Sequence, residues 1–229
     1  MICFDLDNTL ANYGLAESET EVYMAEKVSN IVGVKKVDFL RAFFQIKKKY
    51  LHKDLNPAFF SRALWFKETF ELLNIRGNVN FKELEKNYWE YLTPRVTLFP
   101  KTLEVLNLLK GKYKLACLTD SDGEKSIKIE RLKRLKIENY FDYVITTDDT
   151  GKNKPAAENW EYLLKISGLK GKECMMVGDH PEVDLLNAKR KGFITVWSKE
   201  YIYSDIHLKY VDYEIKDIGE LLNIIKKYG

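Results

Sequence analysis

The stretch ICFDLDNTL, from Ile2 to Leu10, joins a short apolar run to two carboxylates at its carboxyl end. The run is rich in β-forming residues and predicts a buried strand. Side chains two residues apart on a strand point to the same side, so Asp5 and Asp7 are expected to face one site together. Two neighbouring carboxylates repel each other unless they share a proton or a cation. The stretch therefore predicts a strand that ends in a chemically active site.

The composition excludes several classes of protein. The 229 residues are 45% hydrophobic and 31% charged, which is typical of a soluble globular protein with one large domain or two small ones. The net charge of +3, without a long Lys/Arg block, argues against nucleic-acid binding. No apolar stretch is long enough to cross a membrane, and no export signal is recognisable. We expect a cytoplasmic monomer or homodimer whose three cysteines are reduced thiols in the core.

The residues that follow the first strand have a helical pattern. From Ser18 to Thr93, apolar residues repeat at helical spacing in four segments joined by short links. Ser18 with Glu21, and Asn80 with Glu83, are capping boxes that predict the start of the first and the fourth helix. Such a block predicts an antiparallel helical bundle. The expected apolar stripes include Val37, Leu40 and Phe44 on the second helix and Phe59, Ala63, Phe66, Phe70 and Leu73 on the third.

From Pro100 onward, short apolar runs alternate with helical segments. The runs are YKLACL, YFDYVITT, ECMMV, FITVW and, near the end, DYEIK. This alternation predicts a parallel sheet built of βαβ units, which the first strand is expected to join. The prediction is an α/β fold, in which residues 1–14 and 95–229 form a Rossmann-like parallel sheet with helices on both faces. Residues 15–94 are expected to form an inserted all-helical cap.

Polar side chains follow several of these strands where each one ends. In an open parallel sheet, ligands bind beyond the carboxyl ends of the strands. Thr119 follows LACL, Lys154 follows the third run, and Asp179 follows CMMV. A carboxylate from another strand end beside the first acidic pair favours Mg²⁺, while a hydroxyl and an ammonium suit a phosphoryl group. Each motif alone is also explained as a turn, a helix cap or a surface lysine, but their joint occurrence favours one site.

Together the motifs resemble those of the haloacid dehalogenase superfamily, most of whose members are phosphatases. FDLDNTL resembles the first family motif, DxDx[TV], and LACLTD resembles the second, a strand that ends in Ser or Thr. GKNKPAAENW resembles the third motif with its Lys-Pro, and VGDHPEVDLLNAKRKG resembles the fourth, GDxxxD. The resemblance extends over the whole chain, and the helical block matches the four-helix cap of the family.

The resemblance implies a role for each of these residues. Asp5 would attack phosphorus and form an aspartyl-phosphate. Asp7 would protonate the leaving alcohol and then activate the water that hydrolyses the intermediate. Mg²⁺ would be bound by the carboxylates of Asp5 and Asp179 and by the backbone carbonyl of Asp7. The other implied roles are phosphoryl binding by Thr119 and Lys154, orientation of Lys154 or a metal-bound water by Asp184, and substrate contacts by Asp120, Asn12 and Arg62.

Two positions depart from the family pattern or vary within it. Asp120 stands where many relatives have Asn or Gly, so its loop either turns outward or helps to set substrate preference. His180 is expected to be a loop histidine, because imidazole suits an oxygen-ligated Mg²⁺ poorly.

The leading hypothesis is a Mg²⁺-dependent phosphatase acting on a small phosphorylated metabolite. A phosphomutase is a second possibility that the sequence does not separate from it. A 2-haloacid dehalogenase needs neither Asp7 nor Asp179, so both residues argue against that activity. A non-catalytic phosphate-binding module has no need for the full residue set, and a dinucleotide-binding fold lacks its GxGxxG motif.

Overall fold

Six parallel strands form the centre of the protein in the computed structural model, which describes residues 1–51, 56–202 and 204–228. The strand order is β5-β4-β1-β6-β7-β8, and each neighbouring pair is parallel. β1 lies between β4 and β6, so the ends of other strands surround its own end. The predicted α/β fold with a Rossmann-like sheet is confirmed. The strands are β1 Ile2–Phe4, β4 Leu115–Thr119, β5 Tyr143–Thr146, β6 Met175–Gly178, β7 Ile194–Ser198 and β8 Tyr213–Ile215.

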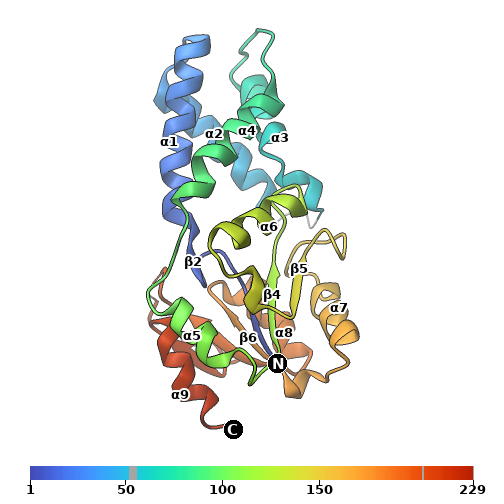
Figure 1. Cartoon of the computed structure of the whole chain (residues 1–229). Helices are drawn as coiled ribbons and strands as arrows, with labels where there is room; N and C mark the ends of the chain where they lie inside the picture. The colour runs from blue at the N-terminus through green and yellow to red at the C-terminus, as the bar shows by residue number, and fades with distance from the viewer. Residues whose placement is uncertain (52–55, 203, 229) are drawn as a thin grey trace.

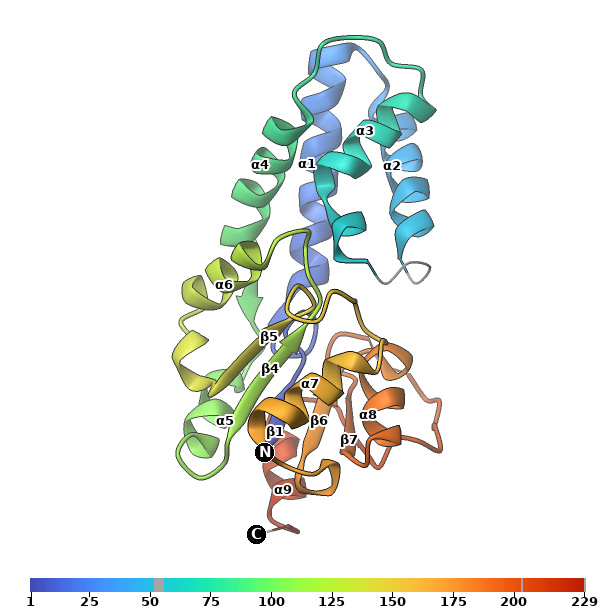
Figure 2. The same ribbon diagram turned by 90° about the vertical axis from the view of Figure 1, so that its right-hand side faces the viewer.

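Helices cover both faces of the sheet, as the sequence predicted (Figures 1 and 2). Ile2 and Phe4 belong to one apolar cluster and Cys3 to another, because successive side chains of a strand point to opposite faces. Cys3, Cys117 and Cys174 are buried and free, as expected of core thiols. The first face is covered by α5 Thr102–Leu109, α6 Lys125–Arg134 and α9 Leu221–Ile225, and the second by α7 Glu158–Ser167 and α8 Leu186–Arg190.

A helical segment separates β1 from the rest of the sheet along the chain. It lies between two short antiparallel strands, β2 (Ala11–Asn12) and β3 (Thr97–Leu98). Figure 1 shows its helices beyond the carboxyl ends of the parallel strands, with both termini at the opposite end of the molecule. Within the described ranges, no helix is long and apolar enough to span a bilayer. The helices are α1 Tyr13–Val32, α2 Lys36–Tyr50, α3 Arg62–Leu72 and α4 Phe81–Leu92.

The first helix begins earlier than its capping pattern predicted. Ser18 does not cap it, because α1 already includes Gly14, and the Ser18 hydroxyl donates to the Gly14 carbonyl at 2.9 Å. The side-chain oxygen of Asn8 accepts a hydrogen bond from the Gly14 backbone N–H at 2.8 Å. A side-chain oxygen from the preceding loop therefore satisfies one N–H of the first turn of this helix. The predicted cap of α4 is confirmed, since the Asn80 side chain accepts from the Glu83 N–H at 3.2 Å.

The second helix buries a different face from the one that its periodicity favoured. Val37 and Phe44 belong to the predicted stripe, but they are 57% and 55% exposed. The buried face presents Phe39 and Phe43, whose rings lie 6.3 and 5.2 Å from the Phe66 ring on α3. Both sets of residues have helical spacing, so packing against α3 selects between them.

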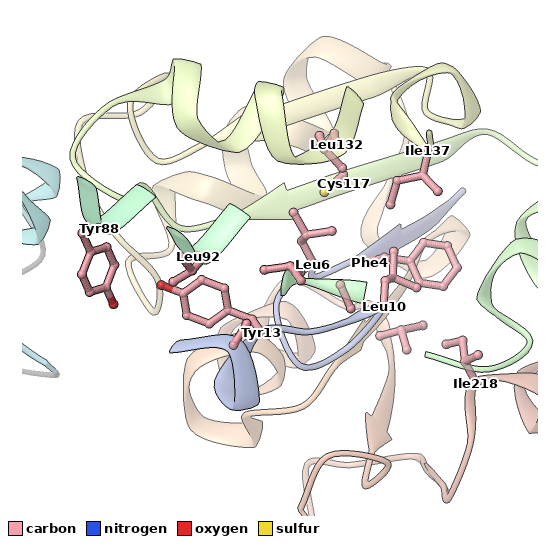
Figure 3. Packing of buried hydrophobic residues seen from close by; sticks show 14 of the residues in the cluster. Phe4, Leu6, Leu10, Tyr13, Tyr88, Leu92, Cys117, Leu132, Ile137 and Ile218 are labelled. Carbon is pink, nitrogen blue, oxygen red and sulfur yellow. The ribbon is translucent and has the colours of Figure 1, made fainter. Parts of the chain in front are cut away.

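The apolar interior of the helical segment is continuous with one face of the sheet. Figure 3 shows Tyr13, at the start of α1, and Leu92, at the end of α4, near Leu6 and Leu10 of the loop after β1. All four side chains are buried. Close packing of this shared cluster therefore holds the helices over the strand ends.

Substituting Phe66→Ala should destabilise the protein by about 3–5 kcal/mol. Phe66 is fully buried and its ring packs near those of Phe39, Phe43 and Tyr88. Phe44→Ala also removes a phenylalanine ring, but from the exposed side of α2, so it should change the free energy of unfolding by no more than about 0.5 kcal/mol. Urea denaturation of both variants measures the difference. Equal losses of unfolding free energy in the two variants would mean that α2 buries the face that carries Phe44.

Candidate active site

The chain turns sharply after β1 and leaves acidic side chains at the carboxyl edge of the sheet. Asp5 continues the strand, and its backbone N–H donates to the Val177 carbonyl of β6 at 2.9 Å. Asn8 has a φ of 63°, in the left-handed region, and its N–H donates to the Ala11 carbonyl at 2.7 Å. This reversal leaves Asp5 and Asp7 at the end of the central strand.

The ammonium group of Lys154 joins two of the buried carboxylates. Its Nζ lies 2.7 Å from Asp5 Oδ1 and 2.6 Å from Asp184 Oδ1. The Thr9 hydroxyl donates to Asp5 Oδ2 at 3.1 Å, so both carboxylate oxygens of Asp5 accept a hydrogen bond. Burial alone would lower the pKa of Lys154, but the carboxylates of Asp184 and Asp5 raise it well above its ordinary value. The ammonium therefore stays charged in the interior.

Asp5, Asp179 and Asp184 form a carboxylate cluster that could hold a metal ion. One oxygen from each residue lies within 4.8 Å of the others. Burial raises the pKa of Asp5 to about 7. Burial, with repulsion from Asp184 and Asp5, also raises the pKa of Asp179. One ammonium, that of Lys154, faces three carboxylates here, so a hard divalent cation with oxygen ligands fits the cluster.

The loop after β4 lies beside this cluster. Thr119 ends the strand and is only 1% exposed. The Asp120 Oδ1 accepts a hydrogen bond from the Lys154 backbone N–H at 2.8 Å, and burial raises the pKa of Asp120. Asp120 therefore anchors the segment that bears Lys154, and its loop does not turn outward. Its part in substrate preference stays a prediction.

Two basic residues of α6 bind the carboxylate of Asp7. Arg131 Nη1 donates to both Asp7 oxygens, at 2.9 and 2.8 Å, and Lys128 Nζ donates to Oδ2. Both cationic side chains are buried. Neither residue was predicted from the sequence. Their spacing of three residues places them on one face of the helix, but solvated helix faces often have the same pattern.

Asp122 extends this charge network to the helical segment. Its Oδ2 lies 2.8 Å from Arg131 Nη2 and 3.0 Å from Lys128 Nζ. Its Oδ1 lies 3.7 Å from Nη2 of Arg62, a buried residue at the start of α3. The same Nη2 donates to Glu17 Oε1 on α1 at 3.3 Å. Burial alone would raise the pKa of Asp122, but the surrounding cations, Lys128 and Arg131 foremost, hold it below its ordinary value.

A cavity of about 250 Å³ lies between the strand ends and the helical segment. The structure does not bring Asn12 into it, because Asn12 lies in β2 opposite Thr97 of β3. A larger groove of about 570 Å³ lies between α4 and α6, but neither Asp5 nor Lys154 lines it, so volume alone does not locate the site. The predicted site residues that line the smaller cavity are Asp5, Asp7, Arg62, Thr119, Asp120, Lys154, Asp179 and Asp184, and His180 also lines it.

Substituting Asp122→Asn should lower the free energy of unfolding at pH 7 by about 3–5 kcal/mol, because buried cations lose a shared partner. The lowered pKa of Asp122 means that its contribution is complete above the unfolded value of about 3.9 and is lost as the pH falls. As the pH falls from about 6 to about 2, the free energy of unfolding should therefore decrease less in the variant than in the wild type, which urea denaturation measures. The exposed control Asp148→Asn should follow the wild type. Parallel curves for Asp122→Asn and the wild type would contradict the pKa assignment.

Comparison with known proteins agrees with this geometry. Residues 2–198 match the family model of the haloacid dehalogenase-like hydrolases. The chain is 32% identical to glyceraldehyde 3-phosphate phosphatase of Methanocaldococcus jannaschii, over 98% of this chain and 96% of the relative. It is 26% identical to ribulose-1,5-bisphosphate 5-phosphatase of Halopiger xanaduensis, over 98% of both chains. The crystal structure of a HAD phosphatase from Thermococcus onnurineus matches with a TM-score of 0.74 and 26% identity, over 98% of this chain and 96% of that one. The protein therefore belongs to the haloacid dehalogenase-like hydrolase family and is a phosphatase of that family.

Proposed function

We propose that this phosphatase hydrolyses monophosphate esters of small metabolites through an aspartyl-phosphate on Asp5, with Mg²⁺ as its cofactor. The observation that carries the proposal is the buried Asp5 carboxylate at the cavity wall, oriented by Lys154 and Thr9. The relatives named above act on glyceraldehyde 3-phosphate and on ribulose 1,5-bisphosphate, which are both small phosphorylated compounds. A cavity of about 250 Å³ suits a substrate of that size.

Asp5 is the proposed nucleophile. A carboxylate oxygen of Asp5 forms a bond to phosphorus while the bond from phosphorus to the substrate oxygen breaks. Water then attacks phosphorus, inorganic phosphate leaves, and the Asp5 carboxylate is restored. Lys154 and Thr9 stay in hydrogen-bonding distance of this side chain, so they orient the nucleophile before the first step. Such fixed orientation lowers the entropy lost on reaching the transition state.

Asp7 is the proposed general acid and base. In the first step the protonated form of Asp7 gives its proton to the leaving oxygen, and in the second step the resulting carboxylate takes a proton from the attacking water, which restores the acid. Lys128 and Arg131 do not belong to the reacting groups in this scheme. They are positioning residues, because their contacts fix the orientation of the Asp7 side chain.

The proposed Mg²⁺ ligands are the carboxylates of Asp5 and Asp179 and the backbone carbonyl of Asp7. Asp184 belongs to the same carboxylate cluster and also holds Lys154 in place. When bound, the ion supplies positive charge that offsets the charge of the phosphoryl oxygens. Thr119 and Lys154 would bind other phosphoryl oxygens. Residues 15–94 would act as a cap that excludes water from the cavity.

Replacing Asp5→Asn should abolish phosphate release from p-nitrophenyl phosphate, because an amide cannot form the intermediate. Asp7→Asn should slow release by about 10²–10⁴-fold, the usual contribution of a general acid and base. Asp142→Asn serves as the control, since Asp142 binds Lys114 at the opposite end of the sheet and does not line the cavity. Normal turnover by Asp5→Asn would refute the nucleophile assignment.

Removing divalent cations with EDTA should stop turnover, and added Mg²⁺ should restore it. Asp179→Asn should raise the Mg²⁺ concentration needed for half-maximal rate, because it removes one charged ligand. Mg²⁺ should also raise the melting temperature of the wild type more than that of the variant, since a ligand that binds the folded state stabilises it. Metal-independent release of chloride from a 2-chloro acid would instead indicate a dehalogenase.

A further inference from the structure

On the cavity wall formed by the helical segment, the basic side chains that the structure describes are paired with carboxylates. Lys47 Nζ lies 2.6 Å from Glu17 Oε2 and 2.7 Å from Glu21 Oε1. Arg62 Nη2 lies 3.3 Å from Glu17 Oε1 and also faces Asp122 at 3.7 Å. Glu17, Lys47 and Arg62 all line the cavity. Lys47 and Arg62 are therefore already paired with carboxylates.

The same balance holds on the wall formed by the sheet and α6. Lys128 Nζ binds Asp7 and lies 3.0 Å from Asp122 Oδ2, while Lys154 binds Asp5 and Asp184. In residues 1–51, 56–202 and 204–228, each Lys or Arg that lines the cavity has a carboxylate partner within 3.3 Å.

Further contacts hold the Arg62–Glu17 pair in place. The Arg62 guanidinium lies 4.0 Å from the centre of the Trp65 ring and 4.8 Å from that of Trp89, and its Nη1 donates to the Phe60 carbonyl at 2.8 Å. The Glu17 Oε1 accepts additional hydrogen bonds from Tyr13 Oη at 3.2 Å and Tyr88 Oη at 3.4 Å. A carboxylate or second phosphate on the substrate would have to displace these carboxylates or lie beside them.

We propose that the enzyme selects phosphate monoesters whose leaving group is small and uncharged, such as an aldehyde or a polyol, and rejects substrates with a second anionic group. The inference rests on the proposed function, which supplies the phosphoryl transfer. Its physical basis is like-charge repulsion, because a second anionic group would lie beside carboxylates that already pair with the described Lys and Arg side chains of the cavity. Glu17 is the main specificity-determining residue, because its carboxylate pairs with both Lys47 and Arg62.

Steady-state kinetics on matched substrates tests the proposal. Glyceraldehyde 3-phosphate and 3-phosphoglycerate share one carbon skeleton and differ by an aldehyde against a carboxylate. The kcat/KM of the wild type should be higher for the aldehyde by about tenfold or more. Ribulose 5-phosphate should likewise be preferred over ribulose 1,5-bisphosphate. Equal or inverted preference in the first pair would overturn the proposal, while hydrolysis of p-nitrophenyl phosphate would leave the proposed function intact.

A charge variant tests the role of Glu17 directly. Glu17→Gln keeps the side-chain shape but leaves Lys47 and Arg62 with less compensating charge, so the aldehyde-to-acid ratio of kcat/KM should fall by about fivefold or more. Glu68→Gln is the matched control, since Glu68 lies on α3, binds Lys49 and Tyr50, and does not line the cavity. Its ratio should equal that of the wild type.

The variant has three informative outcomes. A fall in the ratio for Glu17→Gln alone supports the proposal, and circular dichroism verifies that both variants are folded. An unchanged ratio in folded Glu17→Gln would overturn the assignment of selectivity to Glu17. If this variant does not fold, the aldehyde-to-acid ratio of kcat/KM in the wild type decides whether the enzyme rejects a second anionic group. Failure of the wild type to hydrolyse any of these esters, p-nitrophenyl phosphate included, would overturn the proposed function and this inference with it.

Discussion

The buried ammonium of Lys154 is the interaction on which the site depends. It lies between carboxylates that belong to two separate segments, Asp5 at the end of β1 and Asp184 after β6. A buried cation without partners is strongly destabilising, whereas a cation with well-placed carboxylates is tolerated. The fold therefore reaches its full stability only when these strand ends converge. The same convergence brings Asp179 near Asp5 and creates the carboxylate cluster.

A second set of buried charges joins the helical segment to the sheet. Asp122 contacts Arg62 of α3 on one side and Arg131 of α6 on the other. The backbone at Gly123 also lies close to the backbone at Ser61, since a Cβ added to Gly123 would lie 3.1 Å from the Ser61 Cα. Gly123 also has a φ of 102°, which side chains rarely adopt. Together with the shared apolar cluster, these contacts position the helices over the cavity.

Much of the site could be predicted from the sequence, and the reason is topological. Asp5, Thr119 and Asp179 each end or directly follow an apolar run, and parallel strands necessarily end at one edge of their sheet. The partners of Asp7 could not be predicted in this way. Lys128 and Arg131 lie in the middle of a helix with many basic residues, and only the packing of α6 against the loop after β1 selects those two. Asn12 shows the converse, since it follows the motif closely in the chain but lies in β2, away from the cavity.

The sequence by itself determined how strands and helices alternate along the chain, which residues lie at the strand ends, and the family that these residues indicate. Hydrophobic periodicity and motif spacing are local properties of the chain. The tertiary structure alone decided which face of α2 is buried, which cations hold Asp7, and which carboxylates pair with the described Lys and Arg side chains of the cavity. Those features depend on side chains brought together from distant segments, and on the free energy of burying their charges in one low-dielectric space.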